Sequence, residues 1–202
     1  MASFNILVLD LETQKLFSEV GRSRLERLKI SVVGIYDYVT DQYLAYEEKD
    51  IVNLEKRLRD ADLIVGFNIE RFDLPVLEPY LFVPVKNLPV LDLLKDIEKT
   101  RGHRAGLNHI ARPTLKQQKS GQGRDAIALF KENRMEELKR YCLDDVRLTK
   151  EIYDFGCREG KVYFTSDRDY KTYEIPVFWK QATEEFIRRK GSVTQNFPVS
   201  LF

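Results

Sequence analysis

A near-continuous apolar run close to the amino terminus constrains the fold of this chain most strongly. Residues 4–11 are mostly apolar and of β-favouring types, as in the central strand of a sheet. Shorter β-type runs and segments of helical spacing alternate after it. Strands are predicted over 29–38, 42–46, 63–67 and 89–92, and helices over 52–60, 74–81, 93–99, 107–110, 125–132 and 133–155. This order predicts an α/β or α+β fold in which a mixed sheet of about five strands is flanked by helices.

The carboxy-terminal part of the chain has a different pattern. Residues 161–165 and 170–175 alternate in the β manner around a polar stretch, which predicts a hairpin, and a last helix is expected over 179–188. The chain has 202 residues, 43% of them hydrophobic, which is enough for one well-cored domain. We therefore expect a core over 1–158, with residues 159–202 packed on it as an appended hairpin and helix.

The composition narrows the class of protein. Lys and Arg number 33 against 32 Asp and Glu, so any nucleic-acid binding must come from local clusters rather than net charge. Cys142 and Cys157 have no metal-ligand spacing. The sequence shows neither a signal-peptide pattern after Met1 nor an apolar run of membrane-spanning length. We expect a soluble, cytoplasmic protein that does not engage a membrane.

An aspartate on the apolar face of the helix predicted over 133–155 is the first sign of a site. Asp145 falls near the middle of a buried stripe at helical spacing. The stripe consists of Leu138, Cys142, Thr149 and Ile152. Tyr141, one turn earlier, overhangs the same patch, whereas Asp144 points about 100° away. A carboxylate that faces a core is unfavourable unless it is paired or binds a metal.

Two further carboxylates end the first predicted strand. Side chains alternate along a strand, so Asp10 and Glu12 point to the same side. On local grounds alone, the two carboxylates are also expected if the strand simply emerges into solvent at this point. The ends of strands in α/β proteins commonly carry sites, which favours a functional interpretation.

Asp73 stands at the junction between the fourth predicted strand and the following helix. With Pro75 two residues further on, it also fits an ordinary helix N-cap. Asp92, at the end of the fifth predicted strand, fits the same capping role, and we assign it no other.

Acids from a strand end, a strand–helix junction and a helix face suit hard divalent cations. Mg²⁺ and Mn²⁺ prefer carboxylate oxygens. Two such ions about 4 Å apart activate a water and stabilise the leaving oxygen in phosphodiester cleavage. The sequence contains neither Cys-x-x-Cys nor His-Glu-x-x-His, the patterns that would favour a softer metal.

Three segments resemble, in order, the motifs of the DEDD exonuclease superfamily, which has a ribonuclease H-like fold. Leu-Asp-Leu-Glu-Thr at 9–13 resembles the first motif, and Asn-Ile-Glu-Arg-Phe-Asp at 68–73 the second. Tyr-Cys-Leu-Asp-Asp at 141–145 resembles the third in its tyrosine form, since Arg140 stands where the histidine subclass has its histidine. The wider sequence is similar to stand-alone bacterial and archaeal proteins related to the proofreading domains of family B DNA polymerases.

The resemblance implies a 3′→5′ exonuclease that acts on 3′ ends of single-stranded DNA or RNA and releases nucleoside 5′-monophosphates. It implies that two Mg²⁺ or Mn²⁺ ions are held by four carboxylates, with Asp10 shared between the ions. The four are Asp10, Glu12, Asp73 and Asp145. Tyr141 is then expected to orient the attacking water.

Candidate nucleic-acid contacts come from the motifs and from one loop. The motif residues expected to contact nucleic acid are Leu11, Thr13, Asn68 and Phe72. Core packing is the alternative for Phe72. In the polar loop 116–124, Lys119 and Arg124 flank glycines that allow close approach to a phosphate backbone, although a flexible solvated loop has the same composition. The aromatic and basic hairpin over 161–175 could stack on bases or simply pack on the core.

Other functions stay open. A non-catalytic nucleic-acid-binding or partner module of the same fold is one, and a metal-dependent endonuclease or other phosphodiesterase is another. The choice between DNA and RNA depends on 2′-hydroxyl contacts that no motif specifies. A polymerase or helicase partner would act in trans.

Overall fold

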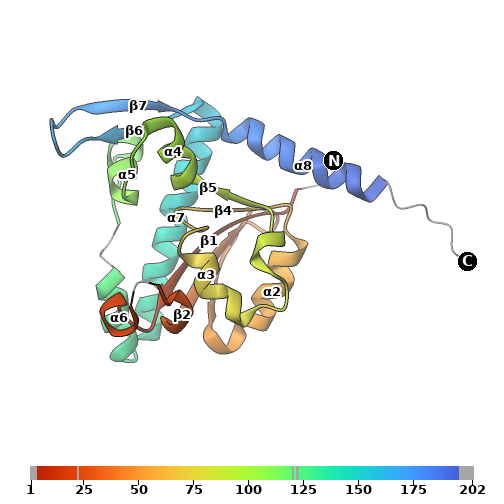
Figure 1. Cartoon of the computed structure of the whole chain (residues 1–202), viewed down its shortest axis with the longest axis vertical. Coiled ribbons are helices and arrows are strands. Elements are labelled where there is room, and N and C mark those ends of the chain that lie inside the picture. Colours follow the sequence, from red (N-terminus) through yellow and green to blue (C-terminus); the bar gives the residue numbers. More distant parts are fainter. Residues whose placement is uncertain (1–3, 22, 120, 122, 196–202) are drawn as a thin grey trace, which may run out of the picture.

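A five-stranded mixed sheet forms the centre of the protein (Figure 1). The computed structural model describes residues 4–21, 23–119, 121 and 123–195. The strands are β1 (Ile6–Thr13), β2 (Ile30–Asp37), β3 (Gln42–Glu47), β4 (Leu63–Gly66) and β5 (Val90–Asp92). Their order is β3-β2-β1-β4-β5, with β1 antiparallel to β2 and parallel to β4. β1 is therefore the central strand, as its apolar sequence predicts.

Helices cover both faces of this sheet. They are α1 (Phe17–Val20), α2 (Ile51–Asp60), α3 (Asp73–Leu77), α4 (Leu93–Arg101), α5 (Leu107–Leu115), α6 (Gly123–Lys131) and α7 (Met135–Glu159). Short 3-10 segments lie at Leu25–Arg27, Glu48–Asp50, Glu78–Tyr80 and Val85–Asn87. With the hairpin β6 (Lys161–Thr165) and β7 (Thr172–Pro176), this arrangement confirms the predicted α/β class.

Several helix boundaries differ from the predicted ones, and α5 in particular continues to Leu115 instead of ending at residue 110. The helix predicted over 74–81 ends at Leu77, because Pro79 has no backbone N–H with which to continue the α-helical ladder. α6 begins at Gly123, so Arg124 lies in a helix rather than in the predicted loop. α7 continues to Glu159, where Gly160 ends it in a left-handed conformation with a φ of 68°.

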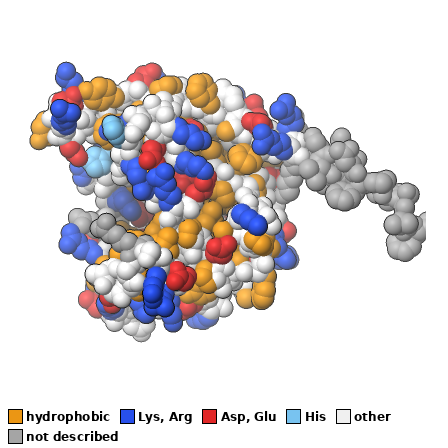
Figure 2. Space-filling model, viewed as in Figure 1, with side chains coloured by type: hydrophobic (Ala, Val, Ile, Leu, Met, Phe, Trp, Pro, Cys, Tyr) orange, Lys and Arg blue, Asp and Glu red, His pale blue; other side chains and the backbone are white. Residues whose placement is uncertain are grey.

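The surface mixes apolar and charged side chains, as Figure 2 shows for one face. None of the helices in the described residues is long and apolar enough to cross a membrane.

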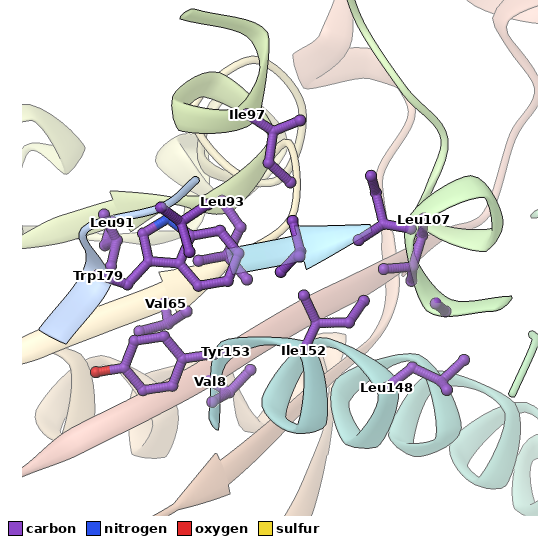
Figure 3. Packing of buried hydrophobic residues seen from close by; sticks show 14 of the residues in the cluster. Val8, Val65, Leu91, Leu93, Ile97, Leu107, Leu148, Ile152, Tyr153 and Trp179 are labelled. Carbon is purple, nitrogen blue, oxygen red and sulfur yellow. The ribbon is translucent and has the colours of Figure 1, made fainter. Parts of the chain in front are cut away.

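The alternation of side chains along β1 divides the interior into two cores. Leu7, Leu9 and Leu11 pack in the core that includes residues of α2 and α3. Val8 points the other way, into the core that includes Ile152 of α7 (Figure 3). Asp10 and Glu12 follow Val8 at two-residue spacing, so they also leave β1 on the side of α7.

The hairpin and α8 (Trp179–Gln195) share the core on the α7 side. Val162, Ile175 and Trp179 belong to the same buried cluster as Val8. A Cβ atom at Gly156 would lie 2.2 Å from the Trp179 ring, so only a glycine lets the indole lie directly on α7. The indole Nε1 donates a hydrogen bond of 2.9 Å to Asp96 of α4, which joins the tail to a second helix.

Candidate active site

The end of β1 places two acids under α7. Asp10 pairs with Gly34 of β2, and the register of this pairing shifts between Glu12 and Thr13. Such irregularities end strand pairing and re-aim side chains beside functional sites. A Cβ atom at Gly34 would lie 2.9 Å from Cys142 Sγ, so the absence of a side chain there lets α7 approach the sheet opposite Asp10.

α7 separates two adjacent aspartates by its turn angle. Asp145 is fully buried and faces β1, whereas Asp144 is half-buried and its Oδ1 lies 2.7 Å from Arg147 Nη2. The sequence predicts this separation, because consecutive helical residues point about 100° apart.

Three carboxylates meet between β1 and α7. Asp10, Glu12 and Asp145 each place one oxygen within 4.8 Å of the others. Burial, and then the nearby charge of Asp145, raise the pKa of Asp10 to about 7. Burial and the charges of Asp10 and Asp145 raise the pKa of Glu12 well above its usual range. Like charges at this separation disfavour one another, so the cluster calls for a cation.

One lysine lies at the cluster. Lys119 Nζ is 2.5 Å from Asp145 Oδ2, and the Lys119 backbone N–H donates to Asn108 Oδ1 at 2.7 Å, which ties the loop to α5. Burial by itself would lower the pKa of Lys119. The nearby charges of Asp10 and Asp145 have the larger combined effect, so the pKa of Lys119 is raised. A single ammonium does not balance three carboxylates. Among the described residues, Asp145 Oδ1 has no hydrogen-bond partner.

Asp73 joins the site from α3 rather than capping that helix. The N-cap of α3 is Phe72, and the Asp73 Oδ1 accepts a hydrogen bond of 3.0 Å from the backbone N–H of Leu11. The side chain is buried, and burial followed by the charge of Asp10 raises its pKa. The capping alternative for Asp73 is therefore wrong: its carboxylate is hydrogen-bonded to β1 at Leu11, the residue between Asp10 and Glu12 in the sequence.

Tyr141 contributes a buried phenol without a partner. Its hydroxyl has no hydrogen-bond partner among the described residues. Burial and the charge of Asp145 raise the pKa of Tyr141, so the hydroxyl stays protonated and is a donor at neutral pH. A Cβ atom at Gly121 would lie 3.1 Å from the ring, so the glycine lets the loop after α5 lie against Tyr141.

A cleft of about 330 Å³ opens onto Asp10, Glu12 and Asp73. It is lined by all six candidate nucleic-acid contacts, namely Leu11, Thr13, Asn68, Phe72, Lys119 and Arg124. Figure 2 shows the molecule hollowed on its left side, where basic side chains lie in and above the hollow. Lys15 and Phe17, which no sequence motif indicates, also line the cleft. Their position within five residues of Glu12 is the signal that would have identified them.

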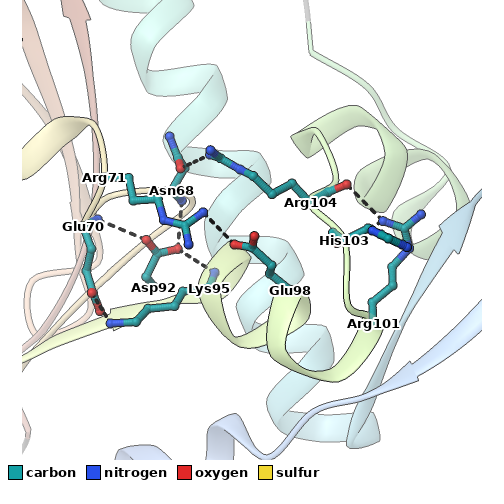
Figure 4. A network of polar contacts seen from close by, with 9 residues as sticks. All are labelled: Asn68, Glu70, Arg71, Asp92, Lys95, Glu98, Arg101, His103 and Arg104. Carbon is teal, nitrogen blue, oxygen red and sulfur yellow. Dashed lines mark hydrogen bonds and ion pairs between the residues drawn. The ribbon is translucent and has the colours of Figure 1, made fainter. Parts of the chain in front are cut away.

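Asp92 holds the loop that carries the second motif (Figure 4). Its Oδ1 accepts hydrogen bonds from the backbone N–H groups of Lys95 at 3.1 Å and Asn68 at 2.9 Å, and its Oδ2 accepts one from Glu70 at 3.0 Å. The capping role predicted for Asp92 is confirmed. The same carboxylate stabilises Asn68 in a left-handed conformation with a φ of 71°.

A mixed sheet with acids at the end of its central strand and on the helix that crosses it defines a ribonuclease H-like α/β protein. The chain belongs to the RNase_H superfamily, whose sequence profile matches residues 7–156. A similar solved structure is the family B DNA polymerase from the hyperthermophilic archaeon Pyrobaculum calidifontis, with a TM-score of 0.61 and 17% identity over 76% of this chain. The match covers 24% of the polymerase chain and shows the fold alone. No curated protein sequence shows significant similarity to the chain.

The donor set fits a divalent cation. All the candidate ligand atoms are carboxylate oxygens, which hard cations prefer. The mutually repelling charges of half-buried Asp10 and of buried Glu12 and Asp145 gain most from such an ion. These three residues would hold it, and Asp73 lies next to them.

Proposed function

We propose that the protein is a metal-dependent 3′→5′ exonuclease of the tyrosine subclass of the DEDD superfamily. It would hydrolyse the terminal phosphodiester bond of single-stranded DNA or RNA and release a nucleoside 5′-monophosphate. One observation carries the proposal: Asp10, Glu12 and Asp145 place oxygens within 4.8 Å of one another. This cluster borders a cleft that the candidate nucleic-acid contacts line.

Two Mg²⁺ or Mn²⁺ ions would be held by Asp10, Glu12, Asp73 and Asp145. When bound, they would lower the pKa of a water and stabilise the leaving oxygen. Asp10 suits the shared position because the clustered acids and Asp73 both lie beside it. The Leu11 N–H fixes the Asp73 carboxylate, which reduces the reorganisation needed on binding.

Tyr141 and Lys119 would act on the water and the phosphate. The Tyr141 hydroxyl is a protonated donor with no partner in the described part of the chain, so it can donate to the attacking water and orient it. Lys119 already lies against the carboxylates and stays protonated. Its ammonium would neutralise charge on the scissile phosphate.

The size of the cleft favours an exonuclease acting on single strands. A cleft of about 330 Å³ suits one nucleotide-sized ligand rather than a stacked base pair. A base must leave the duplex to enter such a site, which costs a few kcal/mol and is easiest at a free end.

The test is degradation of a 5′-labelled oligonucleotide with Mg²⁺ or Mn²⁺. We expect stepwise shortening from the 3′ end, loss of activity in Asp10→Ala and Asp145→Ala, and retained activity in the adjacent control Asp144→Asn. Oligonucleotide binding without turnover would instead identify a binding module. Cleavage of a circular single strand would identify an endonuclease.

A polymerase or helicase is the class of partner that we propose to act in trans. The similar structure is a DNA polymerase, and this chain matches 24% of it. The test is a primer with a mismatched 3′ terminus and a polymerase that lacks its own exonuclease. Extension only after this protein is added would support the proposal, whereas no change in extension would contradict it.

A further inference from the structure

The hairpin of β6 and β7 is buried at its base and exposed at its turn. Val162, Phe164 and Ile175 lie in the core on the α7 side. By contrast, Tyr173 is 47% exposed and Tyr170, in the turn, is 84% exposed. In Figure 1 the hairpin extends past α4 and α5, with its turn at the edge of the molecule. Core packing therefore accounts for the base of the hairpin but not for the side chains at its turn.

Two sets of contacts, one near each end of α5, fix the position of the hairpin. Thr114 Oγ1 accepts a hydrogen bond of 2.9 Å from the Tyr163 backbone N–H and donates one of 3.2 Å to the Tyr163 carbonyl oxygen. At the turn, His109 Nε2 lies 2.9 Å from Asp167 Oδ2. The exposed turn is therefore held beside the first turn of α5.

α5 also joins the hairpin to the acid cluster. Asn108, next to His109, accepts the Lys119 backbone N–H at 2.7 Å, and the Lys119 ammonium contacts Asp145. Adjacent residues of one helix thus hold the hairpin turn and the loop of Lys119. Since a helix with its side chains is about 10–12 Å across, the turn lies on the order of one helix diameter from that loop. In the shared view of Figures 1 and 2, the hairpin lies above the hollow on the left side of the molecule. A strand whose end lies in the cleft can therefore reach the turn.

Two cations of the turn have no carboxylate partner. Arg168 and Lys171 are exposed, and neither side chain makes an ion pair in the part of the chain that the structure describes. The acids of the turn are engaged instead. Asp167 is paired with α5, and Asp169 accepts hydrogen bonds from the Tyr173 hydroxyl and, at 3.3 Å, from the Lys171 backbone N–H. Anionic oxygens that approach this turn therefore meet two available cations.

Tyr170 holds the last position of the turn in an unfavourable backbone conformation. Its N–H donates to the Ser166 carbonyl oxygen at 2.9 Å, and its φ is 55°, in the left-handed region that suits glycine and disfavours a bulky side chain. The ring packs on no other aromatic ring among the described residues. Neither the backbone nor packing thus explains a tyrosine here. An outlier of this kind points to a role in function.

An exposed aromatic ring with cations close to it in the chain suits single-stranded nucleic acid, whose bases stack on aromatic rings while cations follow its backbone. We infer that the hairpin turn binds the substrate strand upstream of the scissile bond, beyond the nucleotides that the cleft holds. A base stacks on Tyr170, and phosphates meet Arg168 and Lys171. The inference rests on the proposed function, because the strand runs from the cleft to the turn only when its 3′ end is bound in the cleft.

A second contact changes how the protein uses long strands. Two linked contacts bind more tightly than either one alone, because the second forms at a high effective concentration. Long single strands should therefore be preferred over short ones. A strand should also stay bound at the turn while a released nucleotide leaves the cleft.

The experiment compares a strand that reaches the turn with one that does not. Dithymidylate is too short, whereas an oligothymidylate of about 16 nucleotides, the upper site size of a single-strand-binding fold, extends past the turn. The measured quantity is kcat/KM for the long strand divided by kcat/KM for dithymidylate, with Mn²⁺. We expect Tyr170→Ala to lower this ratio about tenfold, the size of one lost stacking contact, without changing kcat/KM for dithymidylate. Tyr170→Trp should keep the ratio, because an aromatic ring is retained.

Further variants separate binding from stability. Tyr170→Gly removes the ring and relieves the backbone, so the thermal unfolding temperature should rise while the ratio falls as in Tyr170→Ala. Arg168→Gln combined with Lys171→Gln should make the salt dependence of long-strand binding shallower, by about 0.7 in the slope of log Kd against log salt for each lost phosphate contact. Phe82→Ala and Arg59→Gln are the matched controls, because both residues are exposed and lie outside the hairpin. They should behave as the wild type.

An unchanged ratio in Tyr170→Ala, with circular dichroism showing a folded protein, overturns the inference, and so does a wild-type ratio near one. Failure of the proposed function is a different result, in which the wild type hydrolyses neither strand. Binding of the two strands in EDTA then decides. A preference for the long strand that Tyr170→Ala removes supports the contact at the turn, and any other result overturns it.

Discussion

The buried and half-buried carboxylates of this protein include two kinds with opposite surroundings. Asp92 accepts hydrogen bonds from three backbone N–H groups. Glu55 Oε1 accepts two, from Phe82 at 2.8 Å and Val83 at 2.9 Å. In the described part of the chain, Asp10, Glu12 and Asp145 make no such bond and face one another beside Lys119.

The comparison separates structural acids from acids suited to a cation. Backbone donors compensate a buried charge permanently, so Asp92 and Glu55 need nothing further. Carboxylates that face each other keep their lone pairs available and repel when ionised. Burial alone does not distinguish the two kinds of carboxylate; the partners of each carboxylate oxygen do.

The largest effect is expected on catalysis in the acid cluster. Replacing Asp145 by Asn should lower Mn²⁺-dependent mononucleotide release on the order of 10³-fold, because a metal ligand supplies several kcal/mol of transition-state stabilisation. Quantitative single-turnover assays on a 5′-labelled oligonucleotide measure it. An activity within tenfold of the wild type would show that Asp145 is a structural acid and not a metal ligand.

The next effect is on the stability of the Asp92 region. Asp92→Ala should lower the free energy of unfolding by about 3 kcal/mol, because it removes a helix cap and leaves backbone donors unpaired. Urea unfolding measures this change. Asp144→Ala, which loses only a partly exposed ion pair, is the control and should change it by about 1 kcal/mol or less. Equal losses in the two variants would contradict the structural role of Asp92.

Divalent cations should stabilise the protein through the cluster. At about 100 times the dissociation constant, Mn²⁺ should raise the free energy of unfolding by about 2.7 kcal/mol. Asp10→Asn should lose most of this gain and Asp92→Asn should keep it. Thermal unfolding with and without EDTA provides the measurement. An equal gain in Asp10→Asn would place the cation elsewhere.

The smallest effect, when it is counted per pH unit, is the pH dependence of the stability of the metal-free protein. The pKa of Asp10 is about 7 in the fold against a usual 3.8, so between these values the folded state holds a proton that the unfolded state releases. The unfolding free energy should therefore fall as pH rises through this window, by up to about 1.4 kcal/mol per pH unit. Urea unfolding in EDTA from pH 5 to pH 8 tests it. Asp10→Asn should make the profile shallower without removing it, because the pKa values of Glu12 and Asp73 are raised as well. A stability that rises with pH would contradict the prediction.

Much of the fold and part of the site could be predicted from local pattern. The apolar run of β1 indicates a central strand, and the α7 stripe distinguishes Asp145 from Asp144. Alternation along β1 orients Asp10 and Glu12 together. Each of these inferences uses only a residue and its near neighbours in the chain, whose relative directions the helix or strand geometry sets.

The role of Asp73 could not be predicted from the local sequence pattern. The sequence around it fits an N-cap equally well, and only the hydrogen bond to Leu11, 62 residues away, decides between the two. The pairing of Lys119 with Asp145 and the contact between Phe17 and Phe72 also join residues far apart in the sequence. No periodicity encodes such contacts, because they depend on how separate elements pack.

By itself, therefore, the sequence determined the order of the elements, the central strand and which acids face inward, since these follow from short-range geometry. The tertiary structure alone decided which carboxylates meet, which are satisfied by backbone donors, and that Phe17 packs against Phe72 beside the cleft. The reason is physical: the charge balance and accessibility of a side chain depend on every element packed around it, and packing brings together residues far apart in the chain.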